Sequence, residues 1–320
     1  MIITIPETAD WLMGRDAFLI LTHLRPDGDT IGCAGALAQG LREMGKTAYV
    51  LENPETTSRY ADIVKGYYAP DGYVPDHVVV VDTASEDLLQ TNAAGHVGNV
   101  SLCIDHHPSN KLYAGKTCLA ETCASCGEII YHILSAMCGS VSAKTAEAIY
   151  VALATDTGCF VYANTTADTL RIASLMIEAG APHRELNKLY FRTKTRSRLK
   201  LESMIISGLE YHFGGAVCIS TITRNMMDEA GADESDVDDI ALIPGAIEGV
   251  AAGITVRELS GESDCKISVR TMPHINAGAI CKHFGGGGHQ MAAGASGSYT
   301  VEEFKEKLLK VLAGFFPAGV

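Results

Sequence analysis

The sequence predicts an α/β fold, with a parallel sheet in an N-terminal domain followed by a smaller α/β C-terminal domain. The length of 320 residues suggests two domains, each large enough to bury its own core. The composition, 47% hydrophobic and 20% charged, is that of an ordinary globular protein. From residue 17 to about residue 160, short apolar runs alternate with longer helical ones, and this alternation is typical of βαβ units.

Four apolar runs are predicted to form the strands of the first domain: 18–22, 48–52, 77–82 and 100–105. A helix is expected to begin at Thr30 and to end before Gly45, which would serve as its C-cap. Further helices are predicted over three segments: 125–138, 142–155 and 167–180. Two of the strands stop at polar residues, the third at Asp82 and the fourth at Asp105, which two histidines follow.

A basic segment separates the two domains. Between Glu185 and Glu202 the chain carries six cations and no acid: Lys188, Arg192, Lys194, Arg196, Arg198 and Lys200. We interpret residues 187–212 as a helical linker, which places the first domain at 1–186 and the second at 213–320. Two explanations of these charges remain open: the segment is a basic face exposed to solvent, or it attracts a phosphate-bearing ligand.

The second domain is predicted to contain strands at 217–222, 250–256 and 266–270. A helix over 275–284 leads into four consecutive glycines and His289. The last helix is expected to start at Thr300, since Thr300 and Glu303 form a capping-box pattern.

The turn after the first strand carries three metal-ligand residue types within seven positions: His23, Asp27 and Asp29. It leads from a predicted strand into a predicted helix, and such turns form ligand sites at the carboxyl ends of strands in open α/β sheets. A plain turn would be satisfied by a single Asp acting as a cap. The density of ligand residues therefore favours a binding site.

The complete set of candidate ligands comprises four acids and two imidazoles: His23, Asp27, Asp29, Asp82, His106 and Asp156. Asp105 and His107 flank it. Six ligands are too many for one ion and suit two ions that share a carboxylate. Donor sets dominated by carboxylates suit Mn²⁺ or Mg²⁺, and the histidines favour Mn²⁺. Two such ions can activate a bridging water and bind a phosphoryl oxygen, and they would relieve the repulsion among the acids.

Charge and hydropathy exclude several classes of protein. The net charge of −13 argues against a general nucleic-acid coat protein and gives little grip on long DNA. No apolar run approaches the roughly 18 residues that span a membrane, and the N-terminus lacks a signal-peptide pattern. The ten cysteines read as reduced thiols, so we expect a cytoplasmic location. Cys123 and Cys126 have CxxC spacing but no second pair to complete a zinc site.

Jointly, and in this order, these motifs resemble those of the DHH phosphoesterase superfamily. The residues that carry the resemblance are the His-x-x-Pro-Asp-x-Asp turn from His23, the strand-ending Asp82, the triplet Asp105-His106-His107 and the loop Thr155-Asp156-Thr157-Gly158. The C-terminal Gly-Gly-Gly-Gly-His-x-x-Ala-Ala-Gly segment, with Ser268-Val269-Arg270 before it, resembles the superfamily's associated substrate-binding domain. The resemblance covers essentially the whole chain.

This resemblance implies a role for each matching residue. One ion would be held by His23 and Asp27, the other by Asp29, His106 and Asp156, and Asp82 would bridge the two. His107 would orient the phosphate or act as a general acid, and Asp105 would fix the neighbouring imidazoles. The active site would lie in the cleft between the domains, where the second domain binds the far end of the substrate through five residues: Arg270, Gly286, Gly287, Gly288 and His289.

Arg25 departs from the pattern, since many relatives have Asn at this position. A cation beside the ions would add a phosphate contact or point outward, so the departure bears on substrate preference rather than on the chemistry.

The resemblance implies a hydrolase of the stand-alone branch, which cleaves short RNA oligonucleotides (nano-RNA) and dephosphorylates 3′-phosphoadenosine 5′-phosphate (pAp). The alternative is a phosphodiesterase for cyclic di-AMP or its linear product pApA. RecJ-type exonucleases carry additional domains, and the related pyrophosphatases have a different second domain. A non-catalytic nucleotide sensor would be expected to have lost ligands, and all six are present. The sequence leaves open whether the chain is a monomer or forms a homodimer.

Overall fold

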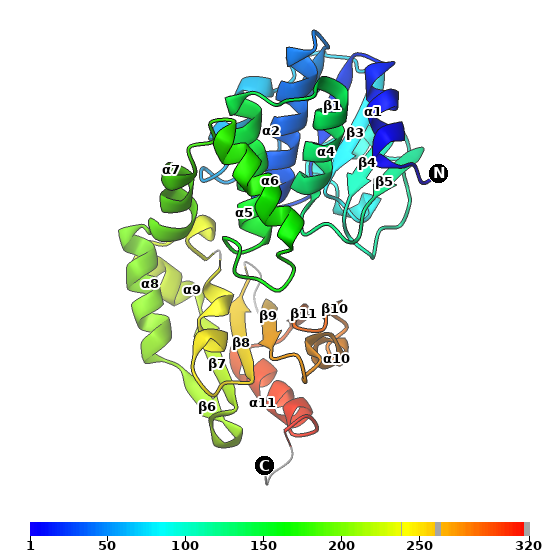
Figure 1. Cartoon of the computed structure of the whole chain (residues 1–320). Coiled ribbons are helices and arrows are strands. Elements are labelled where there is room, and N and C mark those ends of the chain that lie inside the picture. Colours follow the sequence, from blue (N-terminus) through cyan, green and yellow to red (C-terminus); the bar gives the residue numbers. More distant parts are fainter. Residues whose placement is uncertain (238, 260–263, 317–320) are drawn as a thin grey trace. The chain divides into compact units, whose positions relative to one another are not determined.

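The computed structural model describes residues 1–237, 239–259 and 264–316. It divides the chain into two compact units, Met1–Thr193 and Lys194–Val320 (Figure 1). Each unit has its own sheet and its own hydrophobic core.

The sheet of the first unit has five parallel strands in the order β2-β1-β3-β4-β5. Their bounds are β1 Phe18–Leu21, β2 Ala48–Val50, β3 His77–Val81, β4 Leu102–Asp105 and β5 Lys116–Leu119. The four strands predicted from the sequence are all present, and the predicted parallel sheet is confirmed. The sequence pattern missed β5, because a four-residue run that begins Lys-Thr carries little apolar signal.

The helices of the first unit are α1 Ile5–Met13, α2 Gly28–Glu43, α3 Ala61–Val64, α4 Cys126–Cys138, α5 Ala143–Asp156, α6 Ala167–Glu178 and α7 His183–Asn187. Side-chain caps fix several of the starts: Thr4 caps α1, Asp27 caps α2 and Ser142 caps α5. The three helices predicted after residue 120 are confirmed to within two residues, whereas α1 was not predicted.

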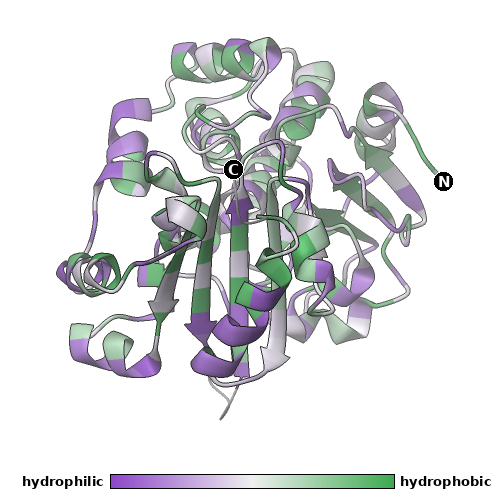
Figure 2. Cartoon of the chain, turned by 90° about the horizontal axis from the view of Figure 1, so that it is seen from below, coloured by the Kyte–Doolittle hydropathy of each residue, from purple (hydrophilic) through white to green (hydrophobic). Residues whose placement is uncertain are grey.

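Alternate residues of the strands enter two cores, as expected for a sheet that is buried on both faces. Ile20, Val79 and Ile104 pack in the larger core together with helical residues, whereas Leu21 and Val80 pack in the smaller one with residues of irregular segments. Every residue of β1 is buried, as is all of β3 after His77, whereas the helices carry both hydrophilic and hydrophobic residues (Figure 2).

Two glycines allow α2 and α5 to approach closely. A Cβ on Gly32 would lie 2.6 Å from the carbonyl oxygen of Ala148, and one on Gly28 would lie 2.4 Å from the side chain of Thr155. The contact brings the start of α2, which carries Asp29, next to the end of α5, which carries Asp156.

The second unit has a six-stranded mixed sheet in the order β10-β11-β9-β8-β7-β6. The strands are β6 Glu210–His212, β7 Val217–Ile222, β8 Ala252–Glu258, β9 Asp264–Thr271, β10 Gly287–Gly288 and β11 Ala292–Ser298. Strands β7 and β8 are parallel and the other neighbours are antiparallel. The helices are α8 Arg196–Ser207, α9 Arg224–Ala230, α10 Ala277–Lys282 and α11 Val301–Leu312. The capping box predicted at Thr300 is confirmed.

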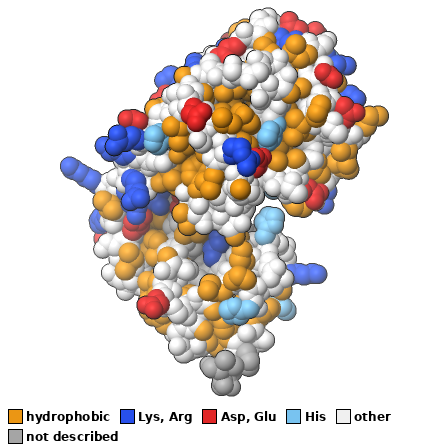
Figure 3. Space-filling model, in the orientation of Figure 1, with side chains coloured by type: hydrophobic (Ala, Val, Ile, Leu, Met, Phe, Trp, Pro, Cys, Tyr) orange, Lys and Arg blue, Asp and Glu red, His pale blue; other side chains and the backbone are white. Residues whose placement is uncertain are grey.

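The basic segment forms ordered structure. Lys188–Arg192 is a π-helical turn, and α8 follows with Leu201 and Ile205 buried. Glu202 forms ion pairs with Lys194 and Arg198, at 2.7 and 2.9 Å. Glu202 thus pairs with two of the six cations, and acidic and basic side chains both occur on the face of the chain seen in Figure 3.

Within the described residues, no helix combines the length and the apolar character that crossing a membrane would require.

Candidate active site

The candidate ligands of the first unit lie at the carboxyl ends of three adjacent strands. His23 follows β1, Asp82 follows β3, and His106 follows β4. Because β1, β3 and β4 are parallel neighbours, their carboxyl ends share one edge of the sheet. The helix termini that carry Asp29 and Asp156 supply the remaining side chains at this edge.

One group of candidate ligands consists of His23, Asp27 and Asp82. The Nε2 atom of His23 lies 3.8 Å from a carboxylate oxygen of Asp27 and 3.8 Å from one of Asp82. The same Oδ1 atom of Asp27 accepts hydrogen bonds from the backbone N–H groups of Asp29 and Thr30. The helix cap therefore holds Asp27 in place.

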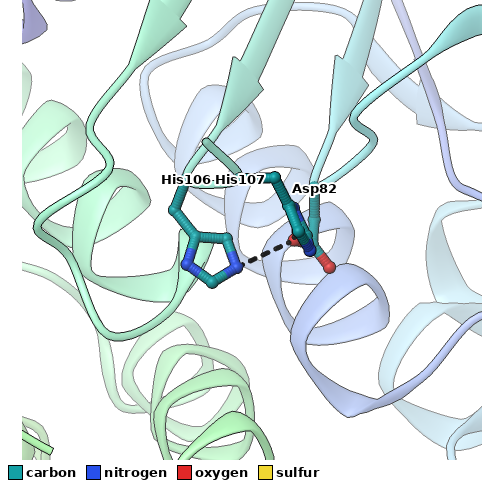
Figure 4. Close-up of side chains that lie close together, drawn as sticks. All are labelled: Asp82, His106 and His107. Atoms are coloured by element: carbon teal, nitrogen blue, oxygen red, sulfur yellow. Dashed lines mark ion pairs between the residues drawn. The ribbon is translucent and has the colours of Figure 1, made fainter. Parts of the chain in front are cut away.

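A second group consists of Asp29, His106 and Asp156. The Nε2 atom of His106 lies 3.9 Å from Asp29 Oδ2 and 3.7 Å from Asp156 Oδ2. It also lies 3.5 Å from Asp82 Oδ1, so Asp82 connects the two groups (Figure 4).

Asp82 has features that a structural carboxylate seldom has. Its side chain is 3% exposed, and its Oδ1 atom has no hydrogen-bond partner. Its backbone φ of 53° is in the left-handed region, which is costly for a residue other than glycine. A divalent cation would satisfy this oxygen, since a buried polar atom without a partner is otherwise destabilising.

The crowding of acids perturbs their protonation. Burial, followed by the charges of Asp156 and Asp27, raises the pKa of Asp29 well above its ordinary value. Burial and the charges of Asp29 and Asp27 do the same to the pKa of Asp82. Burial and Asp27 raise the pKa of Asp156 to about 7. Carboxylates so arranged, with imidazoles between them, form a donor set that suits Mn²⁺ or Mg²⁺.

The N-terminus of α4 holds Asp29, a contact that sequence reasoning missed. The backbone N–H of Cys126 donates to Asp29 Oδ2 at 2.7 Å, and that of Gly127 donates to Asp29 Oδ1 at 3.0 Å. The thiol of Cys33 also donates to Asp29 Oδ1. A carboxylate is favoured at the positive end of a helix, and only tertiary structure could reveal this pairing.

Carbonyl groups orient both candidate imidazole ligands. The Nδ1 atom of His23 bonds the carbonyl of Leu24 at 2.7 Å, and that of His106 bonds the carbonyl of Cys123 at 3.2 Å. These contacts require the proton on Nδ1 and leave Nε2 of each ring able to bind an ion.

His107 is held by Asp105. The Nδ1 atom of His107 donates to Asp105 Oδ1 at 2.8 Å, and Asp105 is fully buried. Burial opposes the charged forms, but this contact outweighs it, raising the pKa of His107 and lowering that of Asp105. The side-chain N–H of Asn110 donates to the other Asp105 oxygen at 2.6 Å. The sequence did not single out Asn110, whose role becomes visible only through this contact.

The proposed substrate-binding residues of the second unit lie apart from the ligand groups along the chain, whereas Arg25 lies between His23 and Asp27. Arg25 is exposed, with its Nε atom 3.9 Å from Glu55 Oε2. Arg270, on β9, donates to its neighbour's carbonyl, and His289 is exposed after β10.

Part of the glycine run serves the fold of the second unit. The N–H of Gly286 donates to the carbonyl of Cys281, and a Cβ at Gly286 would lie 2.2 Å from the carbonyl oxygen of Gly294. Gly287 and Gly288 form β10, where Gly288 has a φ of 143°. The close approach of β11 therefore accounts for at least Gly286.

Comparisons with known proteins agree with this organisation. Residues 17–155 match the family model described as DHH family, N-terminal domain, and residues 214–317 match the DHHA1 domain. The chain is 30% identical to the bifunctional oligoribonuclease and PAP phosphatase NrnA of Thermus thermophilus, over 87% of this chain and 83% of that protein. It is 28% identical to the Bacillus subtilis protein of the same name, over 88% and 89% of the two chains.

Among solved structures, an exopolyphosphatase-related protein from Bacteroides fragilis has the same fold. The TM-score is 0.88 at 22% identity, over 98% of this chain and 96% of that one. Together with the two family matches and the relative at 30% identity, the two-unit architecture establishes that this chain belongs to the DHH family.

Proposed function

We propose that this protein is a phosphoesterase that hydrolyses short RNA oligonucleotides to mononucleotides and dephosphorylates pAp to AMP. The principal support is the pair of ligand groups and the buried Asp82, which belongs to the first group and lies 3.5 Å from His106 of the second, with an Oδ1 atom that has no hydrogen-bond partner. The names of the two relatives described above point to the same pair of substrates.

In this proposal two Mn²⁺ ions, or alternatively Mg²⁺, occupy the two groups. His23 and Asp27 would hold one, Asp29, His106 and Asp156 would hold the other, and Asp82 would contribute a carboxylate to both. When bound, such ions supply an activated water and positive charge for the phosphoryl oxygens. Hydrogen bonds already hold one ligand of each group in the metal-free protein. The backbone N–H of Thr30 at the start of α2 donates to Asp27, and the N–H of Cys126 at the start of α4 donates to Asp29.

His107 is the proposed proton donor. Its Nδ1 proton is engaged by Asp105, so the atom that faces a substrate would be Nε2. A protonated Nε2 would orient a phosphate oxygen or protonate the departing ribose oxygen.

The second unit is proposed to bind the part of the substrate remote from the scissile bond. Arg270 offers a forked guanidinium to a phosphate or a base, while His289 and the amides of Gly287 and Gly288 would lie along a terminal phosphate. Arg25 would add a phosphate contact on the first unit.

The test is turnover by purified protein on pAp, pApA, cyclic di-AMP and RNA of two to five nucleotides. After dialysis against chelator we expect no activity, and restoration by Mn²⁺ better than by Ca²⁺, whose looser geometry suits a pair of ions poorly. We expect pAp and the short RNAs to turn over fastest. Preference for cyclic di-AMP or pApA would favour the alternative phosphodiesterase function, and full activity without metal would refute the two-ion proposal.

Homodimerisation and a cytoplasmic location belong to the same proposal. Light scattering during size-exclusion chromatography measures the oligomeric state, and fractionation of the source cells measures the location.

A further inference from the structure

A buried polar network lies under His23. Gln90, Asn53 and Thr22 are 2%, 4% and 0% exposed, and none of them belongs to the ligand groups. All three are hydrogen-bonded, and their contacts converge on the backbone that carries His23 from the end of β1.

Gln90 joins the ends of two strands. Its Oε1 accepts the backbone N–H of Thr22 at 3.0 Å and the Thr22 hydroxyl at 2.8 Å. Its Nε2 donates to the carbonyls of Leu51 and Glu52, at 3.3 and 3.1 Å, just beyond the end of β2. The pairing of β1 with β2 ends at Ile20 and Val50, so the backbone groups that follow lack a strand partner. The side-chain amide of Gln90 supplies the missing hydrogen bonds to Thr22, Leu51 and Glu52.

Asn53 extends the contact to His23 itself. Its Nδ2 donates to the Thr22 hydroxyl and to the carbonyl of His23, each at 2.9 Å. On the other side, Leu24 donates its N–H to the carbonyl of Leu88, two residues before Gln90. The backbone of His23 is thereby fixed on both sides by groups that touch no other candidate ligand.

The second ligand group depends on different supports. Asp29 is held by the N–H groups of Cys126 and Gly127, and His106 by the carbonyl of Cys123. None of these contacts involves Gln90 or Asn53.

We infer that Gln90, acting with Asn53, is a positioning residue for the first metal position alone, the one formed by His23, Asp27 and Asp82. This inference rests on the metal centre of the proposed function. Removing the network would let the His23 backbone shift, while Asp29, His106 and Asp156 keep their geometry. Partners of this kind change metal affinity by about 10–100-fold.

The experiment measures Mn²⁺ binding by titration calorimetry on the full chain, with anomalous X-ray scattering to locate each ion. The variant Gln90→Met keeps the length of the side chain and removes its amide. Asn53→Ala tests the same network independently, so failure of one variant to fold leaves the other. Thr8→Val is the control, because Thr8 is equally buried in α1 and its hydroxyl donates to the carbonyl of Thr4, which is outside the network.

We expect wild type and Thr8→Val to bind two ions, and both network variants to lose about 10–100-fold in affinity at the His23 position only. Equal weakening at both positions, or no weakening at either, would overturn the inference. A wild-type protein that binds no ion at the His23 position would overturn the proposed metal centre, and the inference with it.

Discussion

At the scale of single residues, Asp82 combines burial, an unpartnered oxygen and a left-handed backbone. Each of these is unfavourable for folding, and together they mark a residue kept for binding rather than for stability. The sequence indicated Asp82 because it ends a valine-rich strand, but the backbone strain was beyond any sequence pattern.

Replacing Asp82 by Asn tests this assignment. The change removes the shared carboxylate while keeping the shape of the side chain, so kcat should fall by several orders of magnitude. In the metal-free protein the melting temperature should hold or rise, because one charge leaves a crowded, buried set of acids. Near-normal kcat would show that Asp82 is not the shared ligand, and calorimetry of the metal-free protein checks the second part.

Asn110 offers a second residue-scale test. The change Asn110→Ala removes the donor to Asp105, which holds His107, so kcat should fall by about 10–100-fold with KM little changed. Mn²⁺ stoichiometry should stay at the wild-type value, because Asn110 touches none of the six candidate ligands. Loss of an ion in this variant would mean that Asn110 supports the metal groups instead.

At the scale of secondary-structure elements, the close contact between α2 and α5 determines whether Asp29 and Asp156 meet. The helix start at Thr300 was predicted correctly because a capping box is a local signal, whereas the start predicted at Thr30 was wrong, since Asp27 caps α2 and the helix begins at Gly28. The distance between two helices is not local, and the glycines that permit it are recognisable only once the partner helix is known.

The variant Gly32→Ala should therefore damage a site that Gly32 does not touch. Its Cβ would meet backbone atoms of Ala148 and Ala152, at 2.6 and 2.9 Å, so the helices must separate. We expect a loss of about 1–3 kcal/mol in the free energy of unfolding and weaker Mn²⁺ binding at the Asp29 position. Gly66→Ala is the control, because nothing lies within 4 Å of a Cβ there. Unchanged stability and binding would refute the close-contact argument.

The ion pairs of α8 predict a pH dependence of stability. Burial alone would raise the pKa of Glu202, but hydrogen bonds from Lys194 and Arg198 outweigh it and lower that pKa. A lowered carboxyl pKa stabilises the fold above the unfolded-state pKa, about 4.3, and this contribution disappears as pH falls through the folded-state value.

Glu202→Gln should accordingly lower stability by about 1–3 kcal/mol at pH 7. The difference from wild type should shrink as pH falls below about 4. Thermal unfolding of both proteins at a series of pH values measures this difference. The matched control is Asp62→Asn, which removes the exposed ion pair between Asp62 and Lys65. A difference that is independent of pH would point to packing instead of charge.

At the scale of the whole molecule, all six candidate ligands lie in the first unit, whereas Arg270 and His289 lie in the second. This division predicts separate kinetic effects. His289→Ala should reduce kcat/KM on a dinucleotide about a hundredfold through lost positioning. It should affect bis-p-nitrophenyl phosphate much less, since that small ester has no remote portion. Equal losses on both substrates, with metal content unchanged, would assign His289 to the chemistry or to the fold.

Much of this architecture was predictable from sequence, because strand ends and ligand residues coincide along the chain. Asp82 and Asp105 terminate apolar runs, so their meeting at one sheet edge follows from parallel pairing. The supports were not predictable: Gln90, Asn110 and the N–H groups of Cys126 and Gly127 act through contacts between distant segments. Strands β5, β6, β10 and β11 were also missed, because β5, β6 and β10 are short and not rich in apolar residues and β11 consists of Ala, Gly and Ser.

The contact between Asp29 and α4 affects how inactive variants should be chosen for trapping a substrate complex. Both oxygens of Asp29 anchor the first turn of that helix, so replacing Asp29 would disturb the scaffold together with the ion. Among the described residues, the Asp156 side chain accepts no hydrogen bond from a helix N-terminus, and it is 31% exposed. To obtain a correctly folded but inactive variant for crystallography, Asp156 should therefore be replaced and Asp29 retained.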